Sequence, residues 1–339
     1  RCQMVPVRHG AACIAMVVLL SSCIKVGADF TPPQTSVTDQ WLDTNGSAVS
    51  RGEVDQAWWK VFGDPVLDEL IETAYRQNLT LQAAGVRVLQ ARAQLGIAVG
   101  DLFPQTQNAF GSTTYNRQSA RAPFQQGSSS SLLSYWQAQV GVQAAWELDF
   151  WGRFRRAIEA ADATLLGSVA DWDNALVSLT GDVATDYVQI RTLEERLAIA
   201  RSNVDVQRES LNIAEIRFQG GTTTERDVEQ ARTVLASTEA SIPQFEASLQ
   251  QTKNALCVLL GIPPSPLAEI LSGSAGIPVA PVQVAAGIPA DLLRRRPDVR
   301  SAELRAAAQS AQIGVAKADL YPAFSLTGNF GFLSTDWGH

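Results

Sequence analysis

Two uninterrupted ladders of apolar residues, spaced seven positions apart, constrain this chain more than any other feature of its sequence. The first ladder is Val169, Leu176, Val183, Ile190, Leu197, Val204 and Leu211, and the second is Val228, Leu235, Ile242, Leu249 and Leu256. A seven-residue apolar repeat keeps one seam against a partner only when helices under-wind to about 3.5 residues per turn and supercoil to the left. The ladders therefore predict two long helices, over residues 152–217 and 224–260, packed as a coiled coil.

The short segment between the two ladders predicts a tight reversal of the chain. Gly220 and Gly221 can end the first helix, and Thr224 can cap the second. At ~1.5 Å per residue the first arm is roughly 100 Å long, which exceeds what an ordinary globular core requires. We therefore expect a long antiparallel helical hairpin.

Composition and charge exclude several classes of function. The 339 residues carry a net charge of −7, which argues against nucleic-acid binding because neutralising phosphates requires a basic face. The basic run Arg294–Arg296 is interpreted as the solvated start of a helix. His9 and His339 are the only histidines, so metal sites and histidine-based catalysis have almost nothing to use. Glu194 and Glu195 lie on an exposed helix face, and we expect no enzyme and no metal.

The first residues have the pattern of an export signal. Arg8 precedes an apolar stretch over residues 11–20 that is too short to span a bilayer. The string Leu20-Ser21-Ser22-Cys23 then fits the processing box of bacterial lipoproteins, which makes Cys23 the lipid-bearing mature N-terminus. We expect a signal peptide over 1–22, a lipid anchor and extended tether over 23–63, and no cofactor besides the covalent lipid.

A strict alternation of apolar and polar residues runs from Trp136 to Phe150. A transmembrane β-strand needs about 9–11 residues and alternates between lipid and a wet lumen. The pattern predicts strands over 103–119 and 135–150 of a transmembrane β-barrel, and the alternative is an amphipathic strand of a soluble sandwich. The residues assigned to the lipid face are Trp136, Val140, Val142, Trp146, Leu148 and Phe150.

The chain also repeats itself at an offset of 218 residues, because the segment from Ala93 to Pro104 recurs from Ala311 to Pro322. This predicts a first structural repeat over 64–261, in which helices occupy 64–102 with Asp64 as the first cap. A Pro-rich linker or equatorial region over 262–289 follows. The second repeat begins at 290–339 and is incomplete, so we expect the chain to be a fragment.

Several motifs resemble those of the outer-membrane factor family, the TolC and OprM kind, and most closely its NodT-type efflux lipoproteins. The most specific is Trp-Glu-Leu-Asp-Phe-Trp-Gly-Arg at 146–153. The others are Trp58-Trp59, Asp64-Pro65-Val66-Leu67, Ala-Val-Gly-Asp-Leu-Phe-Pro at 98–104, Arg294-Arg295-Arg296-Pro297-Asp298-Val299 and Ala318-Asp319-Leu320-Tyr321-Pro322. The resemblance runs from the lipoprotein box to the C-terminus.

The resemblance implies an α+β membrane protein that works as a homotrimer, with strands in one shared barrel and the hairpin in a periplasmic α-barrel. It implies a location in the outer membrane of a Gram-negative bacterium, lipid-anchored, with a large periplasmic part. The implied function is passive passage of small molecules and drugs exported by an inner-membrane pump of the resistance-nodulation-division type through a periplasmic adaptor protein. The alternative is the adaptor class itself, also lipid-anchored, which lacks the barrel strand and the repeat.

The turn between the two long helices corresponds to the family's contact site for the adaptor. The residues carried over are Arg217, Phe218, Gly220, Gly221, Thr222, Asp227 and Val228. Gly220-Gly221 and Thr223-Thr224-Glu225 depart from the family's usual residues, so the sequence leaves the identity of the adaptor open.

Overall fold

The computed structural model describes residues 25–33, 49–50, 57–117, 134–273, 276–280, 284–285 and 293–335. The expected signal peptide, Cys23, most of the tether and the loop over 118–133 lie outside these ranges. The chain divides into two compact units. The first unit comprises Arg1–Pro33, Leu89–Gly167 and Ala302–His339, and the second comprises Gln34–Val88 and Ser168–Ser301.

The helical region expected over 64–102 consists of two helices that meet at Asn78. They are α2 (Pro65–Gln77) and α3 (Leu79–Gly100), and Asp64 caps α2 by accepting hydrogen bonds from the amides of Val66 and Leu67. The Asn78 side chain accepts a hydrogen bond from the Leu81 amide at 2.8 Å and donates one to the Leu259 carbonyl at 2.9 Å. An asparagine side chain offers the backbone such alternatives to helical bonding, which explains the interruption.

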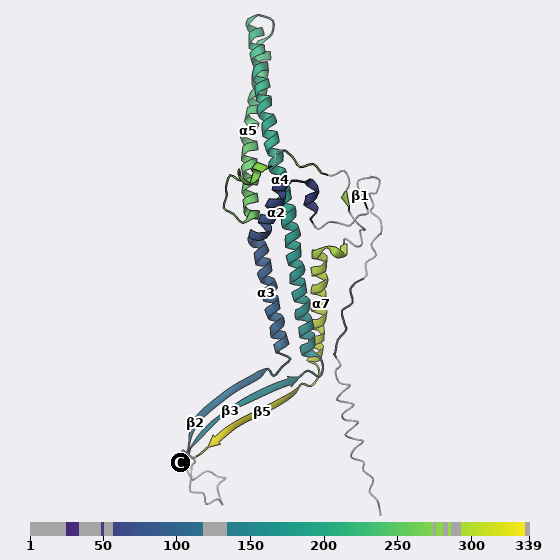
Figure 1. Ribbon diagram of the computed structural model, residues 1–339, viewed down its shortest axis with the longest axis vertical. Coiled ribbons are helices and arrows are strands. Elements are labelled where there is room, and N and C mark those ends of the chain that lie inside the picture. Colours follow the sequence, from purple (N-terminus) through teal and green to yellow (C-terminus); the bar gives the residue numbers. More distant parts are fainter. Residues whose placement is uncertain are drawn as a thin grey trace, which may run out of the picture. The chain divides into compact units, whose positions relative to one another are not determined.

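The two long helices are α4 (Arg153–Gln219) and α5 (Glu225–Leu260), and they form the predicted hairpin (Figure 1). Most of the ladder lies inside the hairpin, where Val183, Ile190, Leu197 and Val204 of α4 and Val228 and Leu256 of α5 are buried. Val169, however, is 37% exposed, contrary to the expected seam. The reason is length, because α4 has 67 residues and α5 only 36, so the start of α4 extends beyond its antiparallel partner.

A hydrophobic core in the second unit joins α2 to parts of α4 and α5. It contains Leu67 and Leu70 of α2, Val183 and Ile190 of α4, and Leu256 of α5, all nearly or fully buried. The core also encloses Cys257, whose free thiol is fully buried. Two short 3₁₀ helices, η1 (Trp58–Phe62) and η2 (Ile270–Gly273), border this core.

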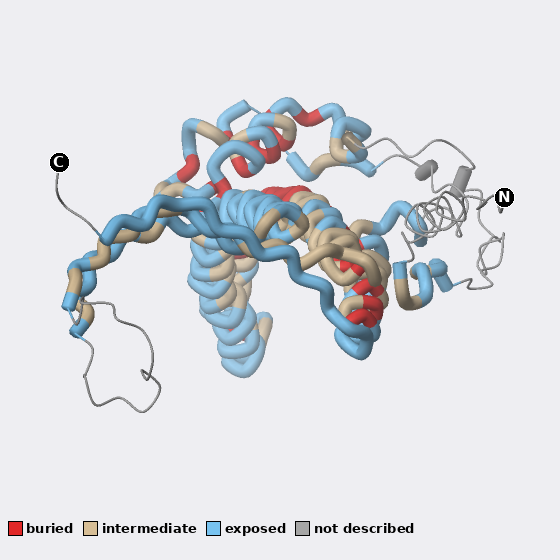
Figure 2. Tube along the Cα trace, turned by 90° about the horizontal axis from the view of Figure 1, so that it is seen from below, coloured by how far each residue is buried: buried red, intermediate tan, exposed pale blue. Residues whose placement is uncertain are grey.

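A three-stranded antiparallel sheet in the first unit has the order β2-β3-β5. Its strands are β2 (Thr106–Arg117), β3 (Ser134–Leu148) and β5 (Phe324–Ser334). No residue of these strands is buried, and the strands are drawn in Figure 2 as exposed or intermediate throughout. A second, two-residue parallel pairing joins β1 (Val49–Ser50), which lies in the expected tether, to β4 (Val284–Ala285), which lies in the expected Pro-rich linker or equatorial region.

The strand predicted to reach Phe150 ends two residues earlier, at Leu148. The amide of Phe150 donates to the Leu148 carbonyl at 2.9 Å, so the chain has turned before Phe150. The Phe150 ring packs edge to face on Phe324, with centroids 5.2 Å apart. The alternation of polar and apolar residues continues past the end of the strand because Asp149 is polar and Phe150 is apolar. Asp149, however, caps α4 and is not part of the strand.

Within the sheet, the Phe110 ring lies against a stretch of backbone that has no side chains. Gly141 is paired with both Phe110 and Gly331 on the neighbouring strands. A Cβ placed on Gly141 would lie 2.7 Å from the Phe110 ring and 2.9 Å from the Gly331 Cα. The ring therefore occupies the space that a side chain at Gly141 would fill, whereas a Cβ on Gly331 would lie 2.6 Å from the Val140 carbonyl oxygen.

The helix α7 (Pro297–Ala318) and the strand β5 repeat the spacing of α3 and β2. The first residues of the two helices, 79 and 297, and their last residues, 100 and 318, are each 218 apart, as are the first residues of the two strands, 106 and 324. In the described part of the chain, no helix combines the length and the apolarity needed to cross a membrane.

Candidate functional site

The residues from Trp146 to Arg156, here called the junction, connect β3 to α4 and contain the most specific motif of the sequence. The Trp146 indole donates to the Leu102 carbonyl at 3.0 Å, just before β2 begins. The Trp151 indole donates to the Pro322 carbonyl at 2.9 Å, just before β5, and stacks on Tyr321. Each indole therefore ties the start of a neighbouring strand to the same short segment.

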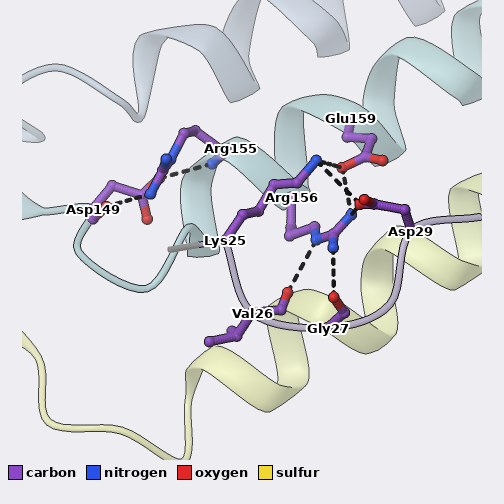
Figure 3. Close-up of polar contacts among 8 residues, drawn as sticks. All are labelled: Lys25, Val26, Gly27, Asp29, Asp149, Arg155, Arg156 and Glu159. Carbon is purple, nitrogen blue, oxygen red and sulfur yellow. Dashed lines mark hydrogen bonds and ion pairs between the residues drawn. The ribbon is translucent and has the colours of Figure 1, made fainter. Parts of the chain in front are cut away.

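Acidic side chains fix how α4 leaves the junction. Asp149 accepts hydrogen bonds from the amides of Phe154 and Arg155, at 3.1 and 3.0 Å, and pairs with the Arg155 guanidinium at 3.0 Å (Figure 3). A carboxylate at a helix N-terminus satisfies amides that have no partner within the helix and interacts favourably with the helix dipole. Arg153 adds ion pairs to Glu147 at 3.1 Å and Asp319 at 3.0 Å.

The described chain begins with a segment, residues 25–29, here called the strap, that lies against the start of α4. The Arg156 guanidinium donates to the Val26 carbonyl at 3.0 Å and to the Gly27 carbonyl at 2.8 Å (Figure 3). The same guanidinium pairs with Asp29 at 2.9 Å and with Glu159 at 2.8 Å, although only 1% of the Arg156 side chain is exposed. The amide of Val26 donates to the Trp151 carbonyl at 3.1 Å, which joins the strap to the junction.

The charges around Arg156 balance one another. Lys25 pairs with Glu159 at 2.9 Å and with Asp29 at 3.5 Å, so two cations face two carboxylates. The hydrogen bond from Arg156, together with the charge of Lys25, lowers the pKa of Asp29. Burial acts to raise the pKa of Glu159, but hydrogen bonds from Lys25 and Arg156 outweigh it and the pKa is lowered. Both carboxylates therefore stay ionised, and able to pair with Arg156, at a lower pH than an unperturbed carboxyl group would.

One face of the sheet is apolar and exposed. Of the residues assigned to lipid, Trp136, Val140 and Val142 are 52–60% exposed. Trp146, Leu148 and Phe150 are only partly exposed because they lie at the junction end of the sheet. The pairing register adds Phe332 opposite Val140 and Phe330 opposite Val142, both more than 70% exposed. These two phenylalanines were missing from the predicted face, although the alternation within residues 324–332 indicates them.

The opposite face of the same sheet is predominantly polar. Gln137, Gln139 and Gln143 of β3 alternate with the apolar residues, and their partners in the register include Asn329 of β5 and Asn108 of β2. A sheet that is exposed on both sides, apolar on one and polar on the other, can separate lipid from water.

The turn between α4 and α5, residues 217–228, is here called the tip. Arg217 and Phe218 belong to the last turn of α4, and the Arg217 carbonyl accepts hydrogen bonds from the amide and the hydroxyl of Thr222. Gly221 has a φ of +72°, whereas Gly220 does not adopt the left-handed conformation, so only one of the two glycines needs that freedom.

The start of α5 is closed by a capping box at the tip. The Asp227 carboxylate accepts hydrogen bonds from the hydroxyls of Thr223 and Thr224, both at 2.7 Å, and from the Thr224 amide at 3.1 Å. These bonds lower the pKa of Asp227 to about 2. Phe218 is 45% exposed, but Val228, which was predicted to contact the adaptor, is buried in the hairpin because it belongs to the apolar ladder.

Among the described residues, no group of three or more His, Cys, Asp or Glu side chains is placed to hold a metal ion. The features that could carry a function are thus surfaces. They are the two faces of the sheet, the junction with its strap, and the tip.

The family model described as outer membrane efflux protein matches residues 70–262 and 288–338. Nodulation protein T of Rhizobium leguminosarum bv. viciae is 33% identical over 319 residues, which cover 94% of this chain and 63% of that protein. The pyoverdine export outer membrane protein OpmQ of Pseudomonas putida is 34% identical, over 89% of this chain and 64% of that protein.

Among solved structures, the outer-membrane channel OprN matches with a TM-score of 0.82 and 34% identity, over 92% of this chain and 68% of that chain. The chain thus spans somewhat less than two thirds of the length of the two relatives and slightly more of OprN. The matched region includes the sheet, the junction and the tip. The chain belongs to the outer membrane efflux protein family.

Proposed function

We propose that this chain is the outer-membrane component of a tripartite efflux system and contributes to a passive conduit for small molecules. The observation that carries the proposal is the sheet, which is exposed on both sides with one apolar and one polar face and continues through the junction into a 67-residue helix. No catalytic step is proposed, and the energy for transport comes from an inner-membrane pump of the resistance-nodulation-division type.

A trimeric β-barrel accounts for the edges of the sheet. Strands β2 and β5 each have a neighbour on one side only, among the described residues. An open sheet edge is not tolerated in lipid, because its backbone groups would lack hydrogen-bond partners. We propose that strands of other subunits of a homotrimer complete the wall, and the 218-residue spacing of α3-β2 and α7-β5 supports two structural repeats in each subunit.

A tube of helices accounts for a second apolar stripe on α4. Ile199, Val206 and Ile213 are again seven apart and are 43–63% exposed, outside the seam that α5 covers. Neighbouring hairpins packed on this stripe form the periplasmic α-barrel that we propose. At its end, the exposed side chains of the tip, Phe218 among them, contact a periplasmic adaptor protein. The apolar sheet favours this function over that of the adaptor class.

The lipid anchor belongs to the same proposal. Cys23 carries the lipid on the sequence evidence of its processing box. The strap begins two residues later and is joined to the junction, where β3 ends and near which β2 and β5 begin. Lipid and strands then enter the membrane from the same end of the helices.

The test places the same charge on opposite faces of one strand. Val142→Arg puts a cation on the apolar face, which costs about 2–4 kcal/mol in the middle of a membrane. Gln143→Arg, one residue away, puts it on the polar face and serves as the matched control. We expect Val142→Arg to reduce heat-modifiable protein in outer-membrane fractions strongly, and Gln143→Arg to insert normally. Equal insertion of both variants would rule out a lipid-facing sheet.

A further inference from the structure

One guanidinium, that of Arg156, binds two backbone carbonyls of the strap. Arg156 donates from Nε and Nη2 to two successive carbonyls, those of Val26 and Gly27. A planar guanidinium can satisfy two acceptors with one fixed geometry, which a lysine cannot. Because Arg156 is almost completely buried, releasing the strap would leave a charge without its carbonyl partners.

The strap also packs closely against α7, with no space for a side chain at Gly27 or Gly314. Gly27 has a φ of +94°, and a Cβ on it would lie 2.8 Å from the Gly314 Cα of α7. A Cβ on Gly314 would in turn lie 2.8 Å from the Cγ and Cδ atoms of Arg156. Figure 3 shows the strap passing between the start of α4 and α7, with the Arg156 side chain directed at its carbonyls. Gly27, Gly314 and Arg156 therefore form a closely packed docking site for the strap, here called the Arg156 seat.

We propose that Arg156 is a positioning residue that docks the N-terminal strap and thereby holds the lipid-bearing end of the chain at the junction. The inference rests on the proposed lipidation of Cys23. Two extended residues span at most about 7 Å, so docking Lys25 limits how far from the junction the lipid can attach. The ion pairs of Lys25 with Glu159 and of Arg156 with Asp29 stabilise the strap at both ends.

Trypsin cleavage after Lys25 provides a direct measure of docking. The Lys25–Val26 bond is protected in the docked strap because the Val26 amide and carbonyl are both hydrogen-bonded. A protease needs the segment to detach before it can cut. In the purified full chain, Arg156→Gln removes the charged donor, and we expect cleavage after Lys25 to become about 10- to 100-fold faster. Mass spectrometry identifies the product that begins at Val26.

Arg155→Gln is the matched control, because it removes the same charge one residue away and pairs with Asp149 rather than with the strap. We expect the wild-type cleavage rate at Lys25 in this variant. Should Arg156→Gln not fold, Gly27→Ala tests the same seat from the strap's side, since its Cβ meets the α7 backbone. Unchanged cleavage after Lys25 in a folded Arg156→Gln or Gly27→Ala variant overturns the proposal.

A second measurement separates this inference from the proposed function. Labelling cells with a radioactive fatty acid, with Cys23→Ser as the negative control, reports on lipidation alone. Loss of protection in Arg156→Gln combined with a label that depends on Cys23 supports the whole inference. The same loss of protection without any label would refute the lipid anchor and leave only the docking of the strap.

Discussion

The tip and the junction are both places where the chain changes direction, but they are held in different ways. The hydrogen bonds of the tip join residues within 217–228 or the last turn of α4. The junction is held by partners at 26–27, 102 and 319–324, which come from distant parts of the sequence. Local contacts form a turn that can be altered alone, whereas long-range contacts make the junction depend on several segments at once.

The largest expected difference in stability between the two regions comes from replacing one glycine in each by alanine. Gly152 and Gly221 have nearly equal φ angles, +77° and +72°, so alanine at either position carries a similar backbone cost of about 1–2 kcal/mol. A Cβ on Gly221 meets nothing within 4 Å, but one on Gly152 would lie 2.9 Å from the Lys25 Cα. We expect Gly152→Ala to cost about 2–4 kcal/mol in total.

Denaturant unfolding of the two alanine variants in detergent measures this difference. Gly221→Ala is the control, since it has the same strain without the crowding. Equal losses in the two variants would mean that the junction is no more tightly packed than the tip.

A smaller difference is expected between the two capping aspartates. Asp149 is mostly buried, and Asp149→Ala removes the cap of α4 together with an ion pair, for a loss of about 1–3 kcal/mol. Asp227→Ala removes only exposed bonds within the tip and should have a clearly smaller effect. The free energies of unfolding of both variants decide this, and the comparison fails if Asp227→Ala proves the more damaging.

The smallest expected effect is the loss at low pH of the stabilisation that Asp227 gives the tip. The pKa of Asp227 is lowered from 3.8 to about 2 in the folded chain, so the unfolded chain binds a proton more readily. Its stabilisation is therefore fully present above about pH 4 and is lost as the pH falls through about 2. We expect the melting-temperature difference between wild type and Asp227→Asn to be constant from pH 7 to 4 and to shrink toward pH 2. A difference that had already vanished at pH 4 would contradict the capping box.

The sequence predicted the hairpin and the alternating strand because both patterns are local. The seven-residue ladder, the Thr224 cap and the Asp64 cap each depend on neighbours a few positions away, and the structure confirms them. The break at Asn78 has a local signal as well, since asparagine favours caps over helix interiors, and α3 begins directly after this residue. The lipid face and the contact residues of the tip remain predictions.

The Arg156 seat could not be predicted from the sequence. Its acceptors are backbone carbonyls about 130 positions away. Every residue has a backbone carbonyl, so the residue types in the sequence do not indicate which carbonyls Arg156 binds. The roles of Gly27 and Gly314 could not be predicted either, because the sequence does not show which neighbouring atoms leave no space for a side chain at a glycine. The end of β3 was misplaced for a related reason, since Asp149 and Phe150 fit the alternation but find their partners in α4 and β5.

The Phe110 ring against Gly141 has a consequence for how this sheet can change during evolution. The ring fills a space that exists only because Gly141 lacks a side chain. Enlarging Gly141 would displace the ring, and shrinking Phe110 would leave the backbone at Gly141 open to water. These two positions, paired on adjacent strands, are therefore expected to vary together among relatives.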